Sequence, residues 1–225
     1  MEDTNNRMDS SCTEGDDGSL SWISWFCSLE GNEFYTEVSE EFIEDSFNLT
    51  GISAHVPFYQ EALGMILDVE PEDDMYSKIP DMTILEPHAE MLYGLIHQRF
   101  INTRPGMRRM LSKYVKGDFG SCPRVYCQQS KVLPCGQHDI PKQSVVRLYC
   151  PSCKDVYAAP AKYNSTDGAH FGTTFPHLLC ETYPEAVPSN PPITYTPRIF
   201  GFRVNELSPT GPRVQWLRLQ PPSAP

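Results

Sequence analysis

The sequence lacks long apolar runs and any segment that resembles a secretory signal. No stretch of 18 consecutive apolar residues occurs, so we expect no membrane-spanning segment. The first residues are acidic and polar where a secretory signal has a basic region, and serines interrupt the apolar run at 20–29. We therefore expect an intracellular protein, in the cytoplasm or the nucleus, whose cysteines are reduced.

Motifs for nucleotide binding and hydrolysis are also missing. The chain contains no G-x4-G-K-[ST], H-E-x-x-H or G-x-S-x-G. Asp118-Phe119-Gly120 matches the tripeptide that positions magnesium in protein kinases, but no glycine-rich loop, V-A-I-K lysine or H-R-D loop accompanies it. We therefore expect that the chain is not an enzyme.

Basic residues are scarce near the N-terminus. Residues 1–50 contain 13 acids and the single base Arg7, within a net charge of −11 for the whole chain. Such a surface repels phosphate backbones, which predicts no nucleic-acid binding, and it suits basic protein substrates or polyamines as partners. The alternative is an acidic face that only keeps the protein in solution. Residues 118–180 hold six bases against four acids, too small an excess for a nucleic-acid-binding ribbon.

The distribution of apolar residues, prolines and acids predicts an α+β fold in four parts. Residues 1–19 are acidic, have no apolar periodicity and are expected to be disordered. An α-helical domain is expected at 20–117, with an acidic loop at 68–81. A small β domain follows at 118–183, and ten of the 21 prolines fall in an extended tail at 184–225.

Four helices are predicted after the first aromatic residues, Trp22, Trp25 and Phe26. One begins at Ser39 with two acids in its first turn, and we expect Phe47 on its apolar side. A second starts near Pro57. A third is long and capped by Thr83, which has capping-box spacing with Glu86. The fourth runs from Pro105 to Gly117, since proline suits a helix start and glycine a helix end.

Four cysteines have the spacing of a metal site, C-x4-C-x22-C-x2-C, with β-type runs at 145–149 and 156–158. Two short cysteine loops about twenty residues apart can bring four thiolates to one Zn²⁺ in a closed, tetrahedral structural site. The pattern therefore predicts a zinc ribbon with one structural zinc per chain. The expected ligands are Cys122, Cys127, Cys150 and Cys153.

Other uses of the cysteines are open alternatives. Disulfide bonds would require an oxidising compartment, which nothing in the sequence indicates. Cys135 and His138 lie in the loop between the two cysteine pairs and are competing ligands. Cys12, Cys27 and Cys180 have no partner at metal-ligand spacing and are expected to be free thiols.

Several segments around these cysteines are specific enough to indicate a family. The chain resembles the casein kinase II regulatory (beta) subunit family from about Ser21 to Val204. The segments that carry the resemblance are Trp22–Cys27 (WISWFC), Gly31–Phe34 (GNEF), Phe47–Gly51 (FNLTG), Ala89–His97 (AEMLYGLIH), Gly117–Gly120 (GDFG) and Cys122–Cys127 (CPRVYC).

The chain departs from that family at two places. The family's acidic loop is interrupted here by Met75, Tyr76 and Ile79, which leaves polyamine or substrate recruitment there undecided. Its docking segment usually reads Tyr-Gly-Phe, whereas this chain has Phe200-Gly201-Phe202. The end, Pro221–Pro225, and the N-terminus also look private to this sequence, which predicts a diverged paralogue.

The resemblance implies a non-catalytic regulatory subunit of a serine/threonine protein kinase. Such a subunit has a helical domain before a zinc ribbon and forms a homodimer through the ribbons. It then forms a heterotetramer with two catalytic alpha subunits, whose activity and substrate choice it modulates. The expected dimer contacts are Pro123, Val125 and Val156, because they are apolar and lie at or near matching positions. The alternative is a zinc-ribbon adaptor that no longer binds a kinase.

The resemblance also implies that a C-terminal segment, 198–204, binds the catalytic subunit. The expected docking residues are Ile199, Phe200, Phe202, Arg203 and Val204. Alternation places Phe200, Phe202 and Val204 on one face of an extended, hairpin-like element, in which Gly201 permits a tight bend. The alternative is that both phenylalanine rings pack on this protein's own helical domain.

The acidic N-terminus contains two candidate phosphate acceptors. Ser11 and Thr13 each have an acid three residues later, Glu14 and Asp16. This is the pattern that an acid-directed kinase prefers, so we predict phosphorylation at both positions. The alternative is an unmodified solubilising tail.

Overall fold

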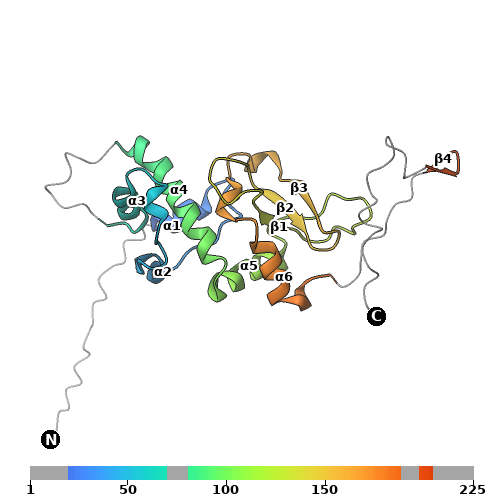
Figure 1. Ribbon diagram of the computed structural model, residues 1–225, viewed down its shortest axis with the longest axis horizontal. Coiled ribbons are helices and arrows are strands. Elements are labelled where there is room, and N and C mark those ends of the chain that lie inside the picture. Colours follow the sequence, from blue (N-terminus) through green and yellow to red (C-terminus); the bar gives the residue numbers. More distant parts are fainter. Residues whose placement is uncertain (1–19, 70–80, 189–197, 205–225) are drawn as a thin grey trace, which may run out of the picture.

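The computed structural model describes residues 20–69, 81–188 and 198–204 (Figure 1). Its α-helices are α1 Trp22–Ser28, α2 Glu40–Glu44, α3 Tyr59–Ile66, α4 Met82–Phe100, α5 Arg104–Lys116 and α6 Phe175–Thr182. Its strands are β1 Leu133–Cys135, β2 Arg147–Cys150, β3 Asp155–Ala158, β4 Arg198–Ile199 and β5 Phe202–Arg203. The described chain also contains short 3-10 turns, which are η1 Ile52–Ala54, η3 Ala161–Tyr163, η4 Gly168–His170 and η5 Pro184–Ala186. This mixture confirms the α+β class, and none of the described helices is long and apolar enough to cross a membrane.

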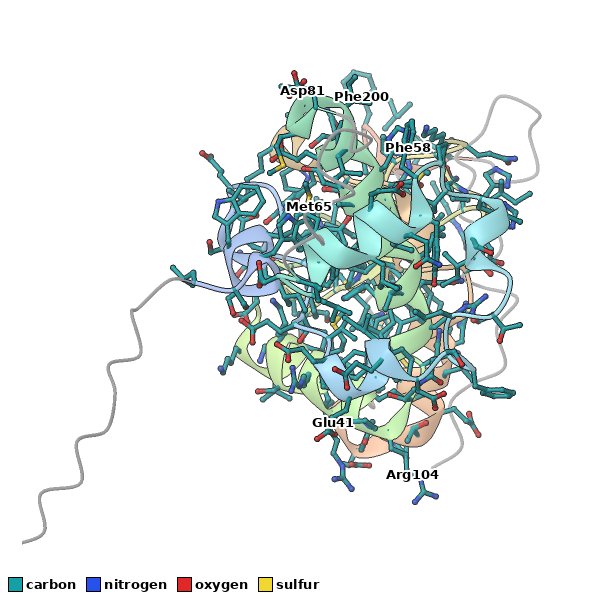
Figure 2. All side chains as sticks on the ribbon, turned by 90° about the vertical axis from the view of Figure 1, so that its left-hand side faces the viewer. Glu41, Phe58, Met65, Asp81, Arg104 and Phe200 are labelled. Atoms are coloured by element: carbon teal, nitrogen blue, oxygen red, sulfur yellow. The ribbon has the colours of Figure 1, made fainter. Side chains whose placement is uncertain are left out.

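Helix α4 is the longest element and lies among the other helices (Figures 1 and 2). One side of α4 is an apolar stripe, because Leu85, Ala89, Leu92, Ile96 and Phe100 are all buried. The predicted cap is wrong by two residues. Asp81 is the N-cap, and its carboxylate accepts a hydrogen bond from the backbone N–H of Thr83 at 3.3 Å. A carboxylate suits this position because it also interacts favourably with the helix dipole.

Helix α5 has the predicted start and end. The Thr103 side chain caps it by accepting from the Gly106 N–H, and Gly117 ends it with a positive φ of 88°. Met110 and Tyr114 are buried on its inner side. The prediction of a helix between Pro105 and Gly117 is therefore confirmed.

Helix α2 is shorter than its pattern suggested, and the expectation for Phe47 is wrong. The helix ends at Glu44, and the Asp45 carboxylate then accepts from the Phe47 N–H in a turn. Side chains such as Asp45 form these local turns in competition with the helix. Phe47 is consequently 82% exposed instead of packing on an apolar face.

The three-stranded sheet is antiparallel, in the order β1-β2-β3. The sequence predicted the central strand β2 and the edge strand β3 at slightly different limits. It did not predict β1. Strand β1 contains Pro134, which cannot donate to a ladder and is tolerated on an edge strand. Strand β3 forms the opposite edge.

Buried polar contacts connect the helices to the chain after the sheet. His97 of α4 accepts from the Thr36 N–H through Nε2, so its Nδ1 donates to the His170 carbonyl at 2.9 Å. Burial lowers the pKa of His97 to about 3, which fits this neutral tautomer. The buried apolar side chains of both halves form one cluster. The domain boundary at residue 117 stays a prediction.

The kinase-like tripeptide has a packing role in this fold. Phe119 is buried and meets the ring of Phe34 edge to face, with centroids 5.7 Å apart. The residue follows helix α5 directly and anchors the connection into the sheet region. This contact gives Phe119 a role in packing.

Candidate metal centre and interaction surfaces

The four predicted ligand cysteines converge on one point. Their sulfur atoms all lie within 4.8 Å of one another, and all four residues are buried. The Cys122 and Cys153 sulfurs are 3.8 Å apart, and those of Cys127 and Cys150 are 3.6 Å apart. These separations are far longer than a disulfide bond of about 2.05 Å. The disulfide alternative is therefore not supported among these residues.

The sulfur separations fit a tetrahedral zinc ion. With zinc–sulfur bonds of about 2.3 Å, the sulfurs of a regular tetrahedron are about 3.8 Å apart. Four thiolates also form a closed set, which leaves no position for a substrate. When bound, the ion would hold the two cysteine loops together, which is a structural role.

The backbone of both loops bends tightly behind the sulfurs. Gln128, Gln129 and Lys154 follow the second cysteine of each pair and have positive φ angles between 52° and 54°. Such angles cost L-residues roughly 1–2 kcal/mol each. The folded site must therefore compensate for this strain. Binding of a metal ion by the four cysteines would supply enough stabilising free energy.

A hydrogen-bonded chain joins the two cysteine loops from outside. Arg124 lies in the first loop, pairs with the Asp155 carboxylate at 2.6 Å and donates from Nε to the Tyr157 hydroxyl at 2.8 Å. The Tyr157 oxygen lies 3.0 Å from the Cys153 sulfur. Because Tyr157 accepts from Arg124, its proton is free to reach Cys153. Hydrogen bonds from Cys150 and then Tyr157 lower the pKa of Cys153 to about 5, which favours the thiolate.

Sequence reasoning missed this chain of contacts. Arg124, Asp155 and Tyr157 each lie within four residues of a ligand cysteine, but proximity alone does not reveal which side chains face the sulfurs. The strand register supplies that information. Asp155 pairs with Cys150 across β2 and β3, and Tyr157 is on the same side of β3 as Asp155.

The other described cysteines, Cys27, Cys135 and Cys180, stay outside the site. Among the residues that the structure describes, no further group of three His, Cys, Asp or Glu ligands is close enough to hold a metal. Cys135 is buried in β1 whereas His138 is exposed, so the competing pair is not supported. Burial raises the pKa of Cys27, Cys135 and Cys180 to about 11 in each case, which keeps them protonated.

The predicted dimer residues are all exposed apolar side chains close in sequence to the ligand cysteines. Val125 is 86% exposed in the first loop, and Val156 is 45% exposed on the edge strand β3. Pro123 is exposed as well. Their role at a dimer interface stays a prediction.

The predicted docking segment is a hairpin of strands β4 and β5, drawn apart from the helices in Figure 1. Ile199 pairs with Phe202, and the turn between them is formed by Phe200 at φ 48° and Gly201 at φ 85°. Two positive φ values are typical of tight hairpin turns. The hairpin-like form is confirmed, but the single extended face is wrong, because Phe200 is a turn residue.

The exposure of the hairpin tests the alternative in which its rings pack on the helical domain. Phe200 is 97% exposed and Phe202 is 80% exposed. Neither ring packs on the helices, so that alternative is contradicted. Ile199 and Arg203 are exposed and Val204 is half-buried. The described hairpin thus presents several apolar side chains without a partner of their own.

Several predicted features lie outside the described residues. They are the segment 1–19 with the free thiol Cys12 and the phosphate acceptors Ser11 and Thr13, most of the tail after residue 188, and most of the acidic loop, 70–80. At the start of that loop, the Asp68 carboxylate accepts from the Trp22 N–H at 2.9 Å. This acid therefore stabilises the first turn of α1.

Comparison with known proteins defines the family. The model of the casein kinase II regulatory subunit family matches residues 21–203. Casein kinase II subunit beta-2 of Schizosaccharomyces pombe is 53% identical over 204 residues, which cover 89% of this chain and 80% of the relative. A putative casein kinase II subunit beta-4 of Arabidopsis thaliana is 52% identical over 199 residues, covering 88% of this chain and 69% of the relative. Casein kinase II subunit beta′ of Drosophila melanogaster is 47% identical over 191 residues, covering 84% and 86%.

The fold and the four-cysteine cluster define an α+β protein whose cysteines could hold one metal ion and whose C-terminal hairpin is exposed. The matches narrow that class to one family. The chain belongs to the casein kinase II regulatory subunit family.

Proposed function

We propose that this chain acts as the non-catalytic regulatory subunit of a casein kinase II-type serine/threonine kinase. The family match over residues 21–203 carries the proposal, because it reaches into the exposed hairpin at 198–204. In this role the chain binds one structural zinc ion, and two chains dimerise through Pro123, Val125 and Val156. The dimer binds two catalytic alpha subunits, modulating their activity and substrate choice inside the cell.

The exposed hairpin supports a partner-binding role. Aromatic residues that enter a pocket on a partner contribute most of the affinity in many interfaces. Phe200 and Phe202 are aromatic and exposed, and the hairpin pairing already fixes their backbone. A preformed backbone loses less conformational freedom on binding. The neighbouring Ile199, Arg203 and Val204 would complete the contact.

Co-purification tests the function directly. We expect the tagged chain, expressed together with an untagged casein kinase II catalytic alpha subunit, to retain that subunit in equal amount through a high-salt wash. An unrelated zinc-ribbon protein carrying the same tag serves as the control. A folded, zinc-loaded chain that retains no catalytic subunit would favour the adaptor alternative.

We also expect phosphorylation at Ser11 and Thr13, because each has an acid three residues later. Incubation with the catalytic subunit and ATP should add up to two phosphates to residues 1–19, measured by mass spectrometry of peptides. Glu14→Gln together with Asp16→Asn should reduce this labelling at least fivefold by removing the acids. The prediction is wrong if residues 1–19 stay unmodified.

A further inference from the structure

Helix α5 carries a concentration of positive charge that the rest of this acidic chain does not share. Its bases are Arg104, Arg108, Arg109, Lys113 and Lys116, and it has no acid. With 3.6 residues per turn, they cover about half of the helix circumference. Met110 and Tyr114 are buried on the other half. The helix therefore presents a basic side to solvent.

Two of these bases are engaged within the fold. Lys113 donates to the Tyr35 carbonyl and Arg109 to the Glu37 carbonyl, each at 2.6 Å. The other three, Arg104, Arg108 and Lys116, are exposed and are called the basic face here. Figure 2 shows the Arg104 side chain at the edge of the molecule. None of the three has a carboxylate partner within the described part of the chain, where the ion pairs are Arg124–Asp155 and Lys162–Glu33.

Helix stability does not explain the basic face. Arg104 and Arg108 lie in the N-terminal half of α5, where the helix dipole disfavours cations. They are also four residues apart, a spacing at which like charges repel on a helix. Only Lys116, near the C-terminal end, is placed favourably for the dipole. Basic residues that the helix dipole and like-charge repulsion disfavour, and that have no compensating contact, indicate an interaction site.

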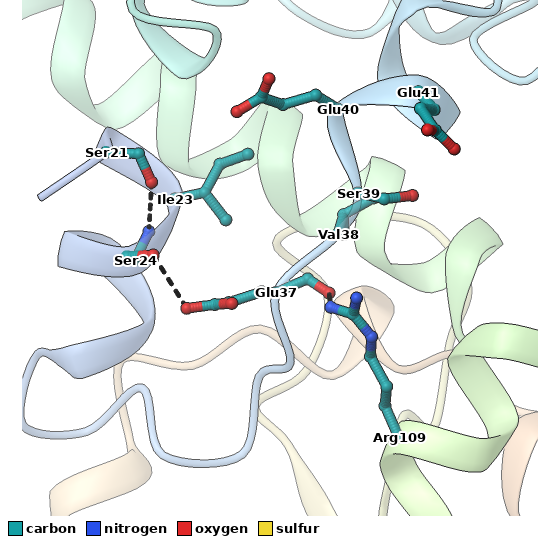
Figure 3. A pocket seen from close by; sticks show the side chains of 9 residues that line it. All are labelled: Ser21, Ile23, Ser24, Glu37, Val38, Ser39, Glu40, Glu41 and Arg109. Carbon is teal, nitrogen blue, oxygen red and sulfur yellow. Dashed lines mark hydrogen bonds between the residues drawn. The ribbon is translucent and has the colours of Figure 1, made fainter. Parts of the chain in front are cut away.

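The N-terminal segment of the same chain has the complementary charge. Residues 1–19 contain six acids and the single base Arg7, which gives a net charge of −5. This segment joins the described chain at Leu20, next to Ser21. Ser21 lines a cavity of about 450 Å³ whose wall also includes Arg109 of α5 (Figure 3).

The attachment point and α5 share one contact residue. Ser24 of α1 donates to the Glu37 carboxylate at 2.9 Å, and Arg109 of α5 donates to the Glu37 carbonyl (Figure 3). The helix that follows the acidic segment therefore contacts the same residue, Glu37, as α5 does.

The length of the segment suffices to reach that face. Nineteen residues span at most about 65 Å when extended and about 24 Å on average as a flexible chain. Helix α5, with 13 residues, is about 20 Å long. A tether of this length gives an effective concentration in the millimolar range. Several weak charge pairs can then act together although each exposed pair contributes little alone.

We propose that the basic face of α5 binds the acidic segment 1–19 of its own chain. Binding is electrostatic and weakens as salt increases. Phosphorylation at Ser11 or Thr13 adds charge of about −1.5 to −2 per group and strengthens it. The proposal depends on charge and attachment alone, so it does not rest on kinase binding.

Zero-length cross-linking of the full chain tests the proposal. A carbodiimide joins carboxylates to lysine amines only where they meet. We expect acids of residues 1–19 to couple to Lys116 at least five times more than to Lys142, an exposed lysine in the sheet region, in 20 mM salt. In 500 mM salt this preference should disappear. An equal mixture of ¹⁴N and ¹⁵N chains identifies links within one chain, which we expect to dominate.

Charge reversal provides the matched control. Arg108→Glu should reduce coupling to Lys116 at least threefold, and Arg104→Glu with Arg108→Glu should abolish the preference. Lys142→Glu, the same change elsewhere, should leave coupling to Lys116 unaltered. Equal coupling to Lys116 and Lys142, no effect of Arg108→Glu, or links only between chains of different isotope would each overturn the proposal.

Discussion

Replacing Cys153 with serine is expected to remove the proposed zinc ion and to abolish the proposed dimer. Cys153 is fully buried, and its sulfur lies 3.8 Å from Cys122 and 3.0 Å from the Tyr157 hydroxyl. A serine hydroxyl is not a thiolate and cannot replace it as a ligand. Structural zinc contributes roughly 10–16 kcal/mol of apparent binding energy in small zinc domains. Both cysteine loops and the exposed surface of Val125 and Val156 depend on that site, so the dimer should be lost with the metal.

Metal analysis by plasma mass spectrometry and sedimentation analysis measure the two effects. We expect one zinc per chain in the wild type and less than about a tenth of that in Cys153→Ser. Cys180→Ser is the matched control, because Cys180 lies on α6 outside the cluster and should keep both zinc and dimer. A wild type without zinc, or a Cys153→Ser variant with an unchanged dimer, would contradict the prediction.

The metal centre was predictable because its ligands are fixed by short spacings along the chain. Two turns, C-x4-C and C-x2-C, determine most of the geometry locally, so the sequence alone indicates which thiols meet. The supporting contacts could not be found in this way. Tyr157 reaches the Cys153 sulfur only because β2 and β3 pair in a particular register, and that register depends on the complete sheet.

The helices show the same division between local and distant causes. The stripe of α4 and the Thr103 and Gly117 ends of α5 follow from local patterns. Phe47 does not, since the carboxylate of Asp45 ends α2 before the aromatic ring can join the apolar side. No local pattern relates His97 to His170, but the fold brings the two together across 73 residues. Burial of that pair is a property of the packed core and not of either segment.

The double change Phe200→Ala and Phe202→Ala is expected to weaken binding of the kinase catalytic subunit at least tenfold, which corresponds to about 1.4 kcal/mol. Both rings are exposed in the described chain, at 97% and 80%, so removing them creates no cavity in the core. Zinc content, dimerisation and the thermal midpoint should therefore stay unchanged. We expect Phe200 to contribute most to binding. It occupies a left-handed turn position that costs an aromatic residue about 1–2 kcal/mol, and a contact with a partner would offset that cost.

Calorimetric titration with the catalytic alpha subunit separates binding from folding. Phe47→Ala is the matched control, since Phe47 is also an exposed phenylalanine, at 82%, but lies far along the chain from the hairpin. Each substitution replaces an exposed phenylalanine with alanine. A general effect of losing exposed aromatic surface would therefore appear in both variants. We expect wild-type affinity for Phe47→Ala and a loss confined to the hairpin variant. Wild-type affinity in the double variant would mean that the catalytic subunit binds elsewhere on the protein, even if the zinc site and the dimer are as proposed.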